Sequence, residues 1–218
     1  MKPVLFVLAG VNGAGKSSVG GATLRSRSLD YFNPDEAASR IRAVLGCPVE
    51  EANARAWNEG RLLLENAIRE RTSHAFETTL GGRTIARLIA QAALTGFDVR
   101  MWYVGVATVE QHIARVRARV AAGGHDIPEE KIRERWDGAR RNLIALKAYL
   151  TELRLFDNSA ERAVGGKIPA PTLLLHWDRG SVIYPSATAV EQLEATPEWA
   201  KPIVAAALQL ARGDDRER

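Results

Sequence analysis

Residues 4–18, "VLFVLAGVNGAGKSS", decide the fold of this chain. The fixed positions of the motif G-x-x-x-x-G-K-[ST] are occupied by Gly10, Gly15, Lys16 and Ser17. An apolar run over 4–8 precedes the motif and predicts a buried strand, and a helix is predicted from 16 to about 24. A strand, a glycine-rich loop and a helix in this order are the context that a phosphate-binding P-loop requires, so we predict a P-loop protein.

The chemistry of such a loop is the binding of a nucleoside triphosphate, here predicted to be ATP. Glycines let backbone N–H groups converge on phosphate oxygens, and the N-terminus of the following helix adds its positive end. We expect Lys16 to reach the β- and γ-phosphates and the Ser17 hydroxyl to bind Mg²⁺. The predicted nucleotide-binding residues of the loop are Gly10, Asn12, Gly13, Ala14, Gly15, Lys16, Ser17 and Ser18.

Composition limits the remaining possibilities. The 218 residues are 46% hydrophobic, enough for a real core without disulfides, and the only cysteine, Cys47, excludes an intrachain disulfide. A single cysteine fits a reducing compartment, so we expect a cytoplasmic protein. No run approaches the roughly 20 apolar residues of a membrane span. The net charge of +4 is too small and too dispersed to indicate nucleic-acid binding.

Strand and helix patterns alternate along the chain, which is typical of a parallel sheet covered by helices. The predicted strands cover 4–8, 29–32, 73–80, 98–106 and 153–159, and a hairpin that turns at 178–180 follows them. We predict an α/β, three-layer P-loop kinase fold with a five-stranded, mostly parallel sheet, helices on both faces and a C-terminal hairpin. One domain is expected over 1–218, with a lid at about 108–147 and the hairpin and last helix at about 171–211.

The sequence motifs that define several other classes of P-loop protein are absent from this sequence. A GTPase would carry N-K-x-D, and ABC or AAA ATPases would carry an apolar strand that ends in two acidic residues; neither pattern occurs. A small-molecule kinase remains, and it needs a base for the acceptor hydroxyl, a substrate pocket and arginines that close over the phosphates.

Asp35, in "YFNPDE", is the predicted base. It follows the second short strand, and the carboxyl ends of neighbouring parallel strands face the same ligand site. An acidic residue there also favours a helix N-terminus, with Asn33 as its cap and Pro34 in the first turn. Asp30 and Glu36 are the alternatives for the base.

The segment "FETTLGGR" ends the third predicted strand and supplies candidates for binding the acceptor. Glu77 is predicted to bind a polar group of the acceptor or to hold Mg²⁺ through water, and Thr79 and Arg83 are predicted acceptor contacts. Thr78 is equally explained by strand packing, because β-branched residues are common in strands.

The predicted lid is formed by two helices that meet at a Gly-Gly hinge. Arg115 and Arg119 lie four residues apart on one helix face, and Arg135 follows the hinge. We expect at least one of these arginines to neutralise charge on the transferring phosphoryl group. His125 and Asp126 suggest loop shaping, since the histidines show no metal-ligand spacing.

The order of "GVNGAGKSS", "NPDEAASR", "FETTLGGR" and "GGHDIPEEKIRERW" resembles the zeta toxin family of P-loop kinases over about residues 3–160. The resemblance implies ATP-dependent phosphorylation of a sugar hydroxyl of UDP-N-acetylglucosamine and an antitoxin as a partner. By position, the resemblance implies that Lys16 is the P-loop lysine and that Asp35 is the base. It implies that Glu77 and Thr79 contact the acceptor sugar, that Arg83 matches the family arginine that follows them, and that the phosphate-binding arginines lie among Arg115, Arg119 and Arg135. It also places Asn158 near the adenine.

Two features keep other functions open. The spacing before Arg83 is longer than in the family, and the lid segment "AAGGHDIP" is more compact, which puts the acceptor in question. The runner-up is a kinase for another small acceptor, such as an antibiotic or a nucleoside. A nucleotide-binding switch protein is an alternative from another class, and a nucleic-acid end kinase is a third.

Overall fold

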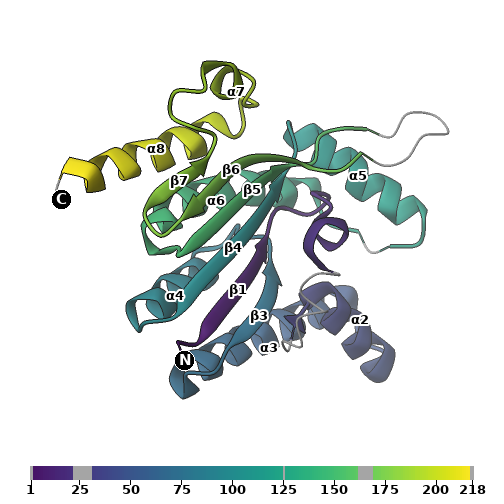
Figure 1. The fold of residues 1–218 in the computed structure, drawn as a ribbon. Helices are drawn as coiled ribbons and strands as arrows, with labels where there is room; N and C mark the ends of the chain where they lie inside the picture. The colour runs from purple at the N-terminus through teal and green to yellow at the C-terminus, as the bar shows by residue number, and fades with distance from the viewer. Residues whose placement is uncertain (1, 22–30, 125, 162–168, 217–218) are drawn as a thin grey trace.

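The computed structural model describes residues 2–21, 31–124, 126–161 and 169–216, and a seven-stranded sheet runs through it (Figure 1). The strands are β1 Val4–Ala9, β2 Tyr31–Phe32, β3 His74–Thr78, β4 Asp98–Gly105, β5 Glu152–Asp157, β6 Thr172–Asp178 and β7 Ser181–Tyr184. The helices are η1 Ser17–Gly21, α2 Pro34–Leu45, α3 Val49–Glu70, α4 Arg83–Leu94, α5 Val109–Ala121, α6 Glu129–Leu146, η2 Lys147–Tyr149, α7 Val190–Glu194 and α8 Lys201–Arg216.

The sheet has the order β2-β3-β1-β4-β5-β6-β7. The first five strands in that order pair in parallel, as predicted. The predicted strand count of five is corrected to seven, because the C-terminal hairpin pairs antiparallel with β5 and extends the same sheet. Its two-residue turn is Arg179-Gly180, with φ of 45° and 87°, a geometry that matches the twist of the flanking strands.

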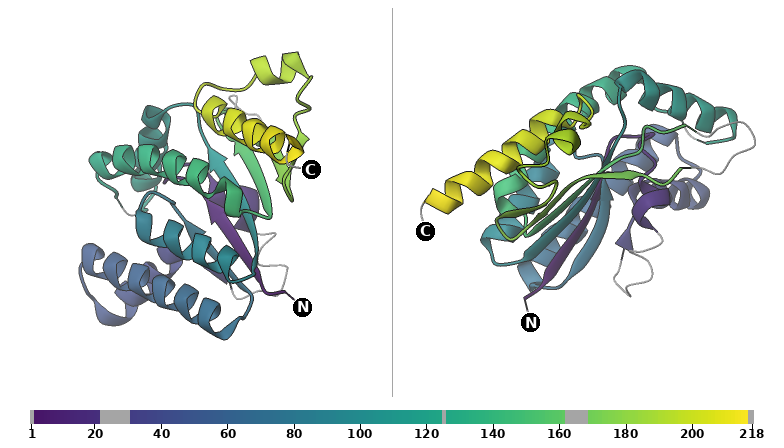
Figure 2. Two further views of the ribbon diagram at one scale, coloured as in Figure 1. Left: turned by 90° about the vertical axis from the view of Figure 1, so that its left-hand side faces the viewer. Right: turned by 45° about the horizontal axis from the view of Figure 1, so that its top comes forward.

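The two faces of the sheet are covered unequally. Helices α3, α4, α6 and α8 pack in a row on one face, where Leu5 and Val7 of β1 enter the main core (Figure 2). Phe6 and Leu8 point to the other face, into a small cluster with Val19 of η1. Both faces therefore carry helix, as predicted, but most of the apolar burial lies on one of them.

The ends of the helices follow the predicted capping chemistry. The Asn33 side chain accepts hydrogen bonds from the backbone N–H groups of Asp35 and Glu36, and Pro34 occupies the first position of α2. Thr108 caps α5 in the same way, by accepting from the backbone of Gln111. The reciprocal bond of a capping box is missing, because Gln111 Oε1 has no partner among the described residues and the Gln111 amide donates to the carbonyl of Ser159.

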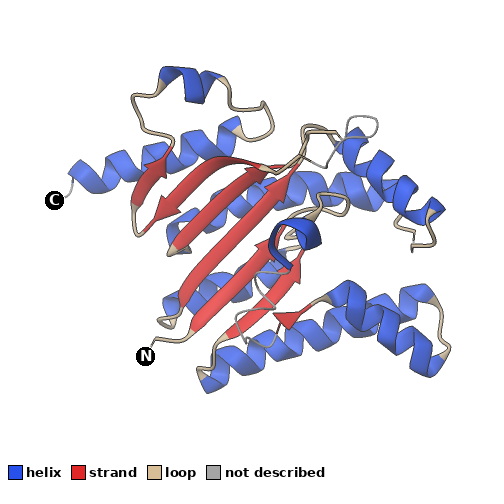
Figure 3. Cartoon of the chain, turned by 45° about the vertical axis from the view of Figure 1, so that its right-hand side comes forward, coloured by secondary structure: helices blue, strands red, loops and turns tan. Residues whose placement is uncertain are grey.

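The parallel register brings three loops to one edge of the sheet. Ala9 at the end of β1 is in register with Thr78 of β3 and Tyr103 of β4, and Gly105 is in register with Asp157 of β5. The P-loop and the segments that follow β3 and β5 therefore meet at the carboxyl ends of the strands (Figure 3). In the part of the chain that the structure describes, no helix has the length and apolarity to span a membrane.

Candidate nucleotide and acceptor site

The P-loop begins at Gly10, directly after β1, and its conformation depends on glycine. Gly10, Gly13 and Gly15 have φ of 145°, 82° and 84°. A Cβ at Gly10 would lie 2.3 Å from the Val104 carbonyl oxygen, and one at Gly13 would lie 2.6 Å from the His112 carbonyl oxygen. The loop thus packs onto β4 and α5 more closely than any side chain would allow.

Lys16 and Glu77 form a buried ion pair at the end of the loop. Lys16 Nζ lies 3.3 Å from Glu77 Oε1 and donates a 2.7 Å hydrogen bond to the Gly10 carbonyl. The other carboxylate oxygen of Glu77 accepts from the Tyr31 hydroxyl at 2.7 Å and from the Asn33 amide at 3.2 Å. Glu77 therefore receives the donors that a buried carboxylate requires, and it joins the P-loop to the start of α2.

Asp35 lies in the first turn of α2 and faces the cavity next to the P-loop. Its side chain is 43% exposed, and its Oδ2 lies 3.8 Å from a guanidinium nitrogen of Arg119 on α5. Because Asn33 bonds to both Glu77 and the N-terminus of α2, it fixes Asp35 relative to the Lys16–Glu77 pair. The sequence indicated Asn33 only as a helix cap.

Asn12 contacts both helices of the 108–147 segment. Its carbonyl accepts a 2.8 Å hydrogen bond from Nδ1 of His112 on α5, and its side-chain oxygen accepts one of 2.8 Å from Arg135 on α6. Burial lowers the pKa of Arg135, an effect that the nearby Asp35 opposes. The P-loop is thus held from its outer side by one residue of each helix.

His112 was not anticipated from the sequence. It is 1% exposed, and its Nε2 has no hydrogen-bond partner among the described residues. Burial lowers the pKa of His112 to about 4, and Lys16 and Arg115 add to the shift, while the bond to Asn12 opposes it. The imidazole is therefore neutral, with its proton on Nδ1, which is the donor that the Asn12 carbonyl needs.

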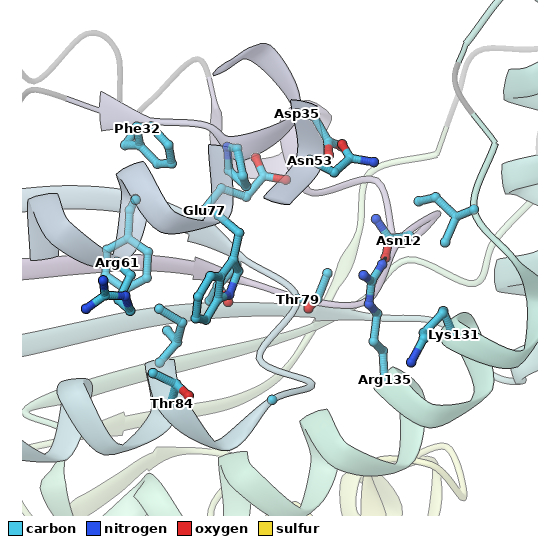
Figure 4. A pocket seen from close by; sticks show the side chains of 18 of the residues that line it. Asn12, Phe32, Asp35, Asn53, Arg61, Glu77, Thr79, Thr84, Lys131 and Arg135 are labelled. Atoms are coloured by element: carbon cyan, nitrogen blue, oxygen red, sulfur yellow. Dashed lines mark hydrogen bonds between the residues drawn. The ribbon is translucent and has the colours of Figure 1, made fainter. Parts of the chain in front are cut away.

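A cavity of about 270 Å³ opens beside the P-loop, between α2, α3, α4 and α6 (Figure 4). Its apolar lining includes Phe32, Trp57, Phe76, Ile85 and Ile127. Its polar lining includes Asn12, Asp35, Asn53, Arg61, Glu77, Thr78, Thr79, Thr84, Asp126, Lys131 and Arg135. Figure 4 shows Asn12 and Arg135 close together at one end and Arg61 at the other. The cavity thus offers room for a small polar molecule next to Asp35.

The other predicted acceptor residues are placed differently. Thr79 lines the cavity, and Thr78 does so while also bonding to the backbone of Leu80, a residue with φ of 57°. Arg83 begins α4 and is not among the residues that line the cavity. The structure therefore brings Asp35, Glu77 and Thr79 together and leaves Arg83 at the start of a helix.

Two further predicted residues, Asn158 and Arg115, bond to the P-loop and to the segment after β5, respectively. Asn158 Nδ2 donates to the Ala14 carbonyl at 2.8 Å, whereas Arg115 lies against the Ala160 carbonyl at 3.5 Å. Ser17 is exposed at the start of η1, and the Ser18 side chain, Asp30 and His125 lie outside the described residues. Asp126 Oδ1 accepts from the backbone of Ile127, which agrees with a loop-shaping role.

A model of the zeta toxin family matches residues 1–164. The chain belongs to the zeta toxin family. The match includes the P-loop, Asp35, Glu77 and both helices that hold Asn12, and it ends before the C-terminal hairpin.

Among relatives of this zeta toxin family member, an uncharacterized protein of Haemophilus influenzae is 33% identical over 131 residues, which are 58% of this chain and 88% of that protein. A chain of the PezAT chromosomal toxin–antitoxin system of Streptococcus pneumoniae superposes with a TM-score of 0.55 at 14% identity, over 97% of this chain and 85% of that one. The AvrRxo1-ORF1:AvrRxo1-ORF2 structure with sulphate ions gives 0.57 at 18% identity, over 96% and 76%. The two superpositions extend the likeness in fold over nearly the whole chain, beyond the residues that the family model matches.

The residues present fit a magnesium ion that arrives with a nucleotide. The Ser17 hydroxyl is exposed directly after Lys16, and the Glu77 carboxylate lies at the same edge of the sheet. Hard oxygen ligands of this kind suit Mg²⁺, which keeps several waters and binds phosphates. Within the described residues there is no group of three or more His, Cys, Asp or Glu side chains that could hold a metal on its own.

Proposed function

We propose that the chain is a kinase that transfers the γ-phosphoryl group of ATP to a hydroxyl of a small-molecule acceptor. The observation that carries this proposal is the cavity wall shared by Asp35, Glu77 and Asn12, which joins a candidate base to the P-loop. An acceptor in this cavity would present its hydroxyl to Asp35 on the side where the P-loop would hold the γ-phosphate. That arrangement supports in-line transfer, in which positioning and electrostatics supply most of the catalysis.

The roles follow from the contacts. Asp35 accepts or orients the proton of the acceptor hydroxyl, and Lys16 leaves Glu77 to bind the β- and γ-phosphates. Mg²⁺, held by Ser17 and the phosphates, would supply charge neutralisation. Arg119 and Arg135 lie near Asp35 and Asn12, so they are the lid arginines best placed to stabilise the transferring group. Arg115 and Asn158 act on the nucleotide side.

Helices α5 and α6 act as the lid in this proposal. Each is attached to the P-loop through Asn12, and the α6 side of the cavity carries Lys131 and Arg135. Closure around the substrates would exclude water from the γ-phosphate and so limit hydrolysis. An ATP-dependent enzyme of this kind would work in the cytoplasm.

UDP-N-acetylglucosamine is the leading acceptor, on the strength of the family, and Glu77 and Thr79 would contact it. The polar and aromatic lining of the cavity suits a sugar, whose ring presents both hydroxyl groups and an apolar face. An antitoxin is the proposed protein partner, because structural neighbours come from a toxin–antitoxin system and from a two-component complex.

The test is a phosphorylation assay with ATP, Mg²⁺ and UDP-N-acetylglucosamine, followed by mass spectrometry for one added phosphate. Lys16→Ala and Asp35→Asn should abolish the product, while Glu36→Gln, the exposed neighbour on α2, should retain it. ATP hydrolysis without product would remove this acceptor and direct the search to antibiotics and nucleosides. Nucleotide binding that leaves every acceptor unchanged, and that Asp35→Asn does not affect, would indicate a switch protein instead.

A further inference from the structure

The C-terminal segment that lies beyond the family match reaches the nucleotide side of the P-loop. Trp199, just before α8, is 4% exposed, and its indole N–H donates a 2.9 Å hydrogen bond to Oδ1 of Asp157 at the end of β5. The indole lies over the carboxyl end of β4, where a Cβ on Gly105 would come within 2.3 Å of the ring. The absence of a side chain at Gly105 is therefore what gives Trp199 access to Asp157.

Asp157 in turn fixes the loop that touches the P-loop. Its Oδ1 also accepts a 2.6 Å hydrogen bond from the Ser159 hydroxyl, and its Oδ2 accepts from the Ser159 backbone at 3.3 Å. Between them, Asn158 is held by its backbone N–H on the Gly105 carbonyl at 2.8 Å. The turn at 157–159 therefore has bonds on both sides of Asn158, and its outer anchor is Trp199.

Asn158 completes the connection. Its Nδ2 donates to the Ala14 carbonyl at 2.8 Å, and a Cβ on Gly15 would approach that same nitrogen to 2.4 Å. A shift of the 157–159 turn by a few tenths of an ångström would thus move or release the P-loop backbone whose N–H groups bind phosphate.

We propose that Trp199 is a positioning residue for the nucleotide site, which acts through Asp157 and Asn158 on the P-loop. In this proposal the segment after residue 168 helps to position the phosphate-binding loop, in addition to extending the sheet. The inference rests on nucleotide binding at the P-loop and does not depend on the identity of the acceptor.

Trp199→Phe tests the proposal, because it keeps an aromatic ring and removes the indole N–H. Trp177→Phe is the matched control: Trp177 is 3% exposed, and its indole N–H donates to the Leu150 carbonyl, which is not part of the P-loop contacts. The first measurement is hydrogen–deuterium exchange of the peptide covering residues 10–18 without nucleotide. Trp199→Phe should accelerate exchange of this peptide roughly threefold to tenfold, and Trp177→Phe should leave it within about twofold of the wild type.

The second measurement is the Kd for MgATP, which should rise by a similar factor in Trp199→Phe only. In an Asn158→Ala background the effect of Trp199→Phe on exchange should disappear, because the last contact is already lost. Equal effects of the two tryptophan variants, or an undiminished effect in the Asn158→Ala background, would overturn the proposal. If the wild type fails to phosphorylate any acceptor, the proposed function falls, while exchange still decides the role of Trp199.

A measurement on the wild-type sequence avoids the risk that a substituted variant does not fold. In protein labelled with 5-fluorotryptophan, the ¹⁹F resonance of Trp199 should shift when MgATP is added, and that of Trp177 should not. A Trp199 resonance that stays fixed while ATP binds would contradict the connection.

Discussion

Lys16 Nζ lies 3.3 Å from Glu77 Oε1, with only 8% and 7% of the two side chains exposed. A carboxylate on the neighbouring strand thus holds the lysine that, in the proposed function, binds the triphosphate. Removing one partner of a buried pair leaves the other charge without compensation, which costs more than the pair contributes.

Glu77→Gln should lower the free energy of unfolding by about 2–4 kcal/mol, because the buried Lys16 ammonium loses its anionic partner. The control is Glu51→Gln, which breaks the exposed pair of Glu51 with Arg55 on α3 and should cost less than about 0.5 kcal/mol. Urea denaturation measures both. A loss no greater than that of the control would show that the Lys16–Glu77 pair contributes nothing to stability.

Arg119→Ala should lower kcat for phosphoryl transfer by about 10²–10³, since Arg119 is the guanidinium beside Asp35. Arg117 lies two residues away on the same helix, and its exposed side chain pairs with Glu129. Arg117→Ala should therefore change kcat by less than about twofold. Steady-state kinetics at saturating ATP compares the two variants. An equal loss of kcat in both would show that Arg119 does not stabilise the transition state.

Gly13→Ala should raise the Kd for MgATP at least about tenfold, because its Cβ would meet the His112 carbonyl at 2.6 Å and its φ is 82°. Gly46, which ends α2 with φ of 62°, has no atom within 4 Å of its would-be Cβ. Gly46→Ala should cost about 1 kcal/mol of stability from backbone strain alone and leave the Kd unchanged. Calorimetric titration distinguishes the two; normal ATP affinity in Gly13→Ala would show that the loop can move away from α5.

His112 should make stability depend on pH. Its pKa is about 4 in the folded protein and near 6.5 in the unfolded chain, so the unfolded state binds a proton first as the pH falls. The contribution is complete above about pH 6.5, is lost between about 6.5 and 4, and amounts to about 3 kcal/mol. His112→Asn keeps a donor near the Nδ1 position without titrating, so its unfolding free energy should lack this slope. Urea titrations at several pH values test this, and parallel curves for the two proteins would refute it.

The P-loop, the positions of the parallel strands and the cap at Asn33 were predictable from the sequence, because each depends on residues close together in the chain. The turn at Arg179-Gly180 was predictable for the same reason. That the hairpin would join the main sheet was not, since the pairing of β6 with β5 leaves no local signal.

The candidate site was predictable in its residues but not in its connections. Lys16, Asp35 and Glu77 were singled out by type and by place after a strand. The structure places Asp35 and Glu77 on one cavity wall and pairs Lys16 with Glu77. The contacts of Tyr31 with Glu77 and of His112 with Asn12 span 46 and 100 residues of sequence. Such contacts are set by how the helices pack on the sheet, so neither a single motif nor a spacing reveals them.

The direction of β1 has a practical consequence. The strand starts at Val4 and delivers the chain to the P-loop at its far end, roughly 20 Å away. Helix α8 runs in the opposite sense: it starts beside Trp199 and leads away from the carboxyl edge of the sheet (Figure 1). Both ends of the described chain therefore point away from the cavity, so the protein can be anchored to a sensor surface by either one while the cavity stays open to the solution.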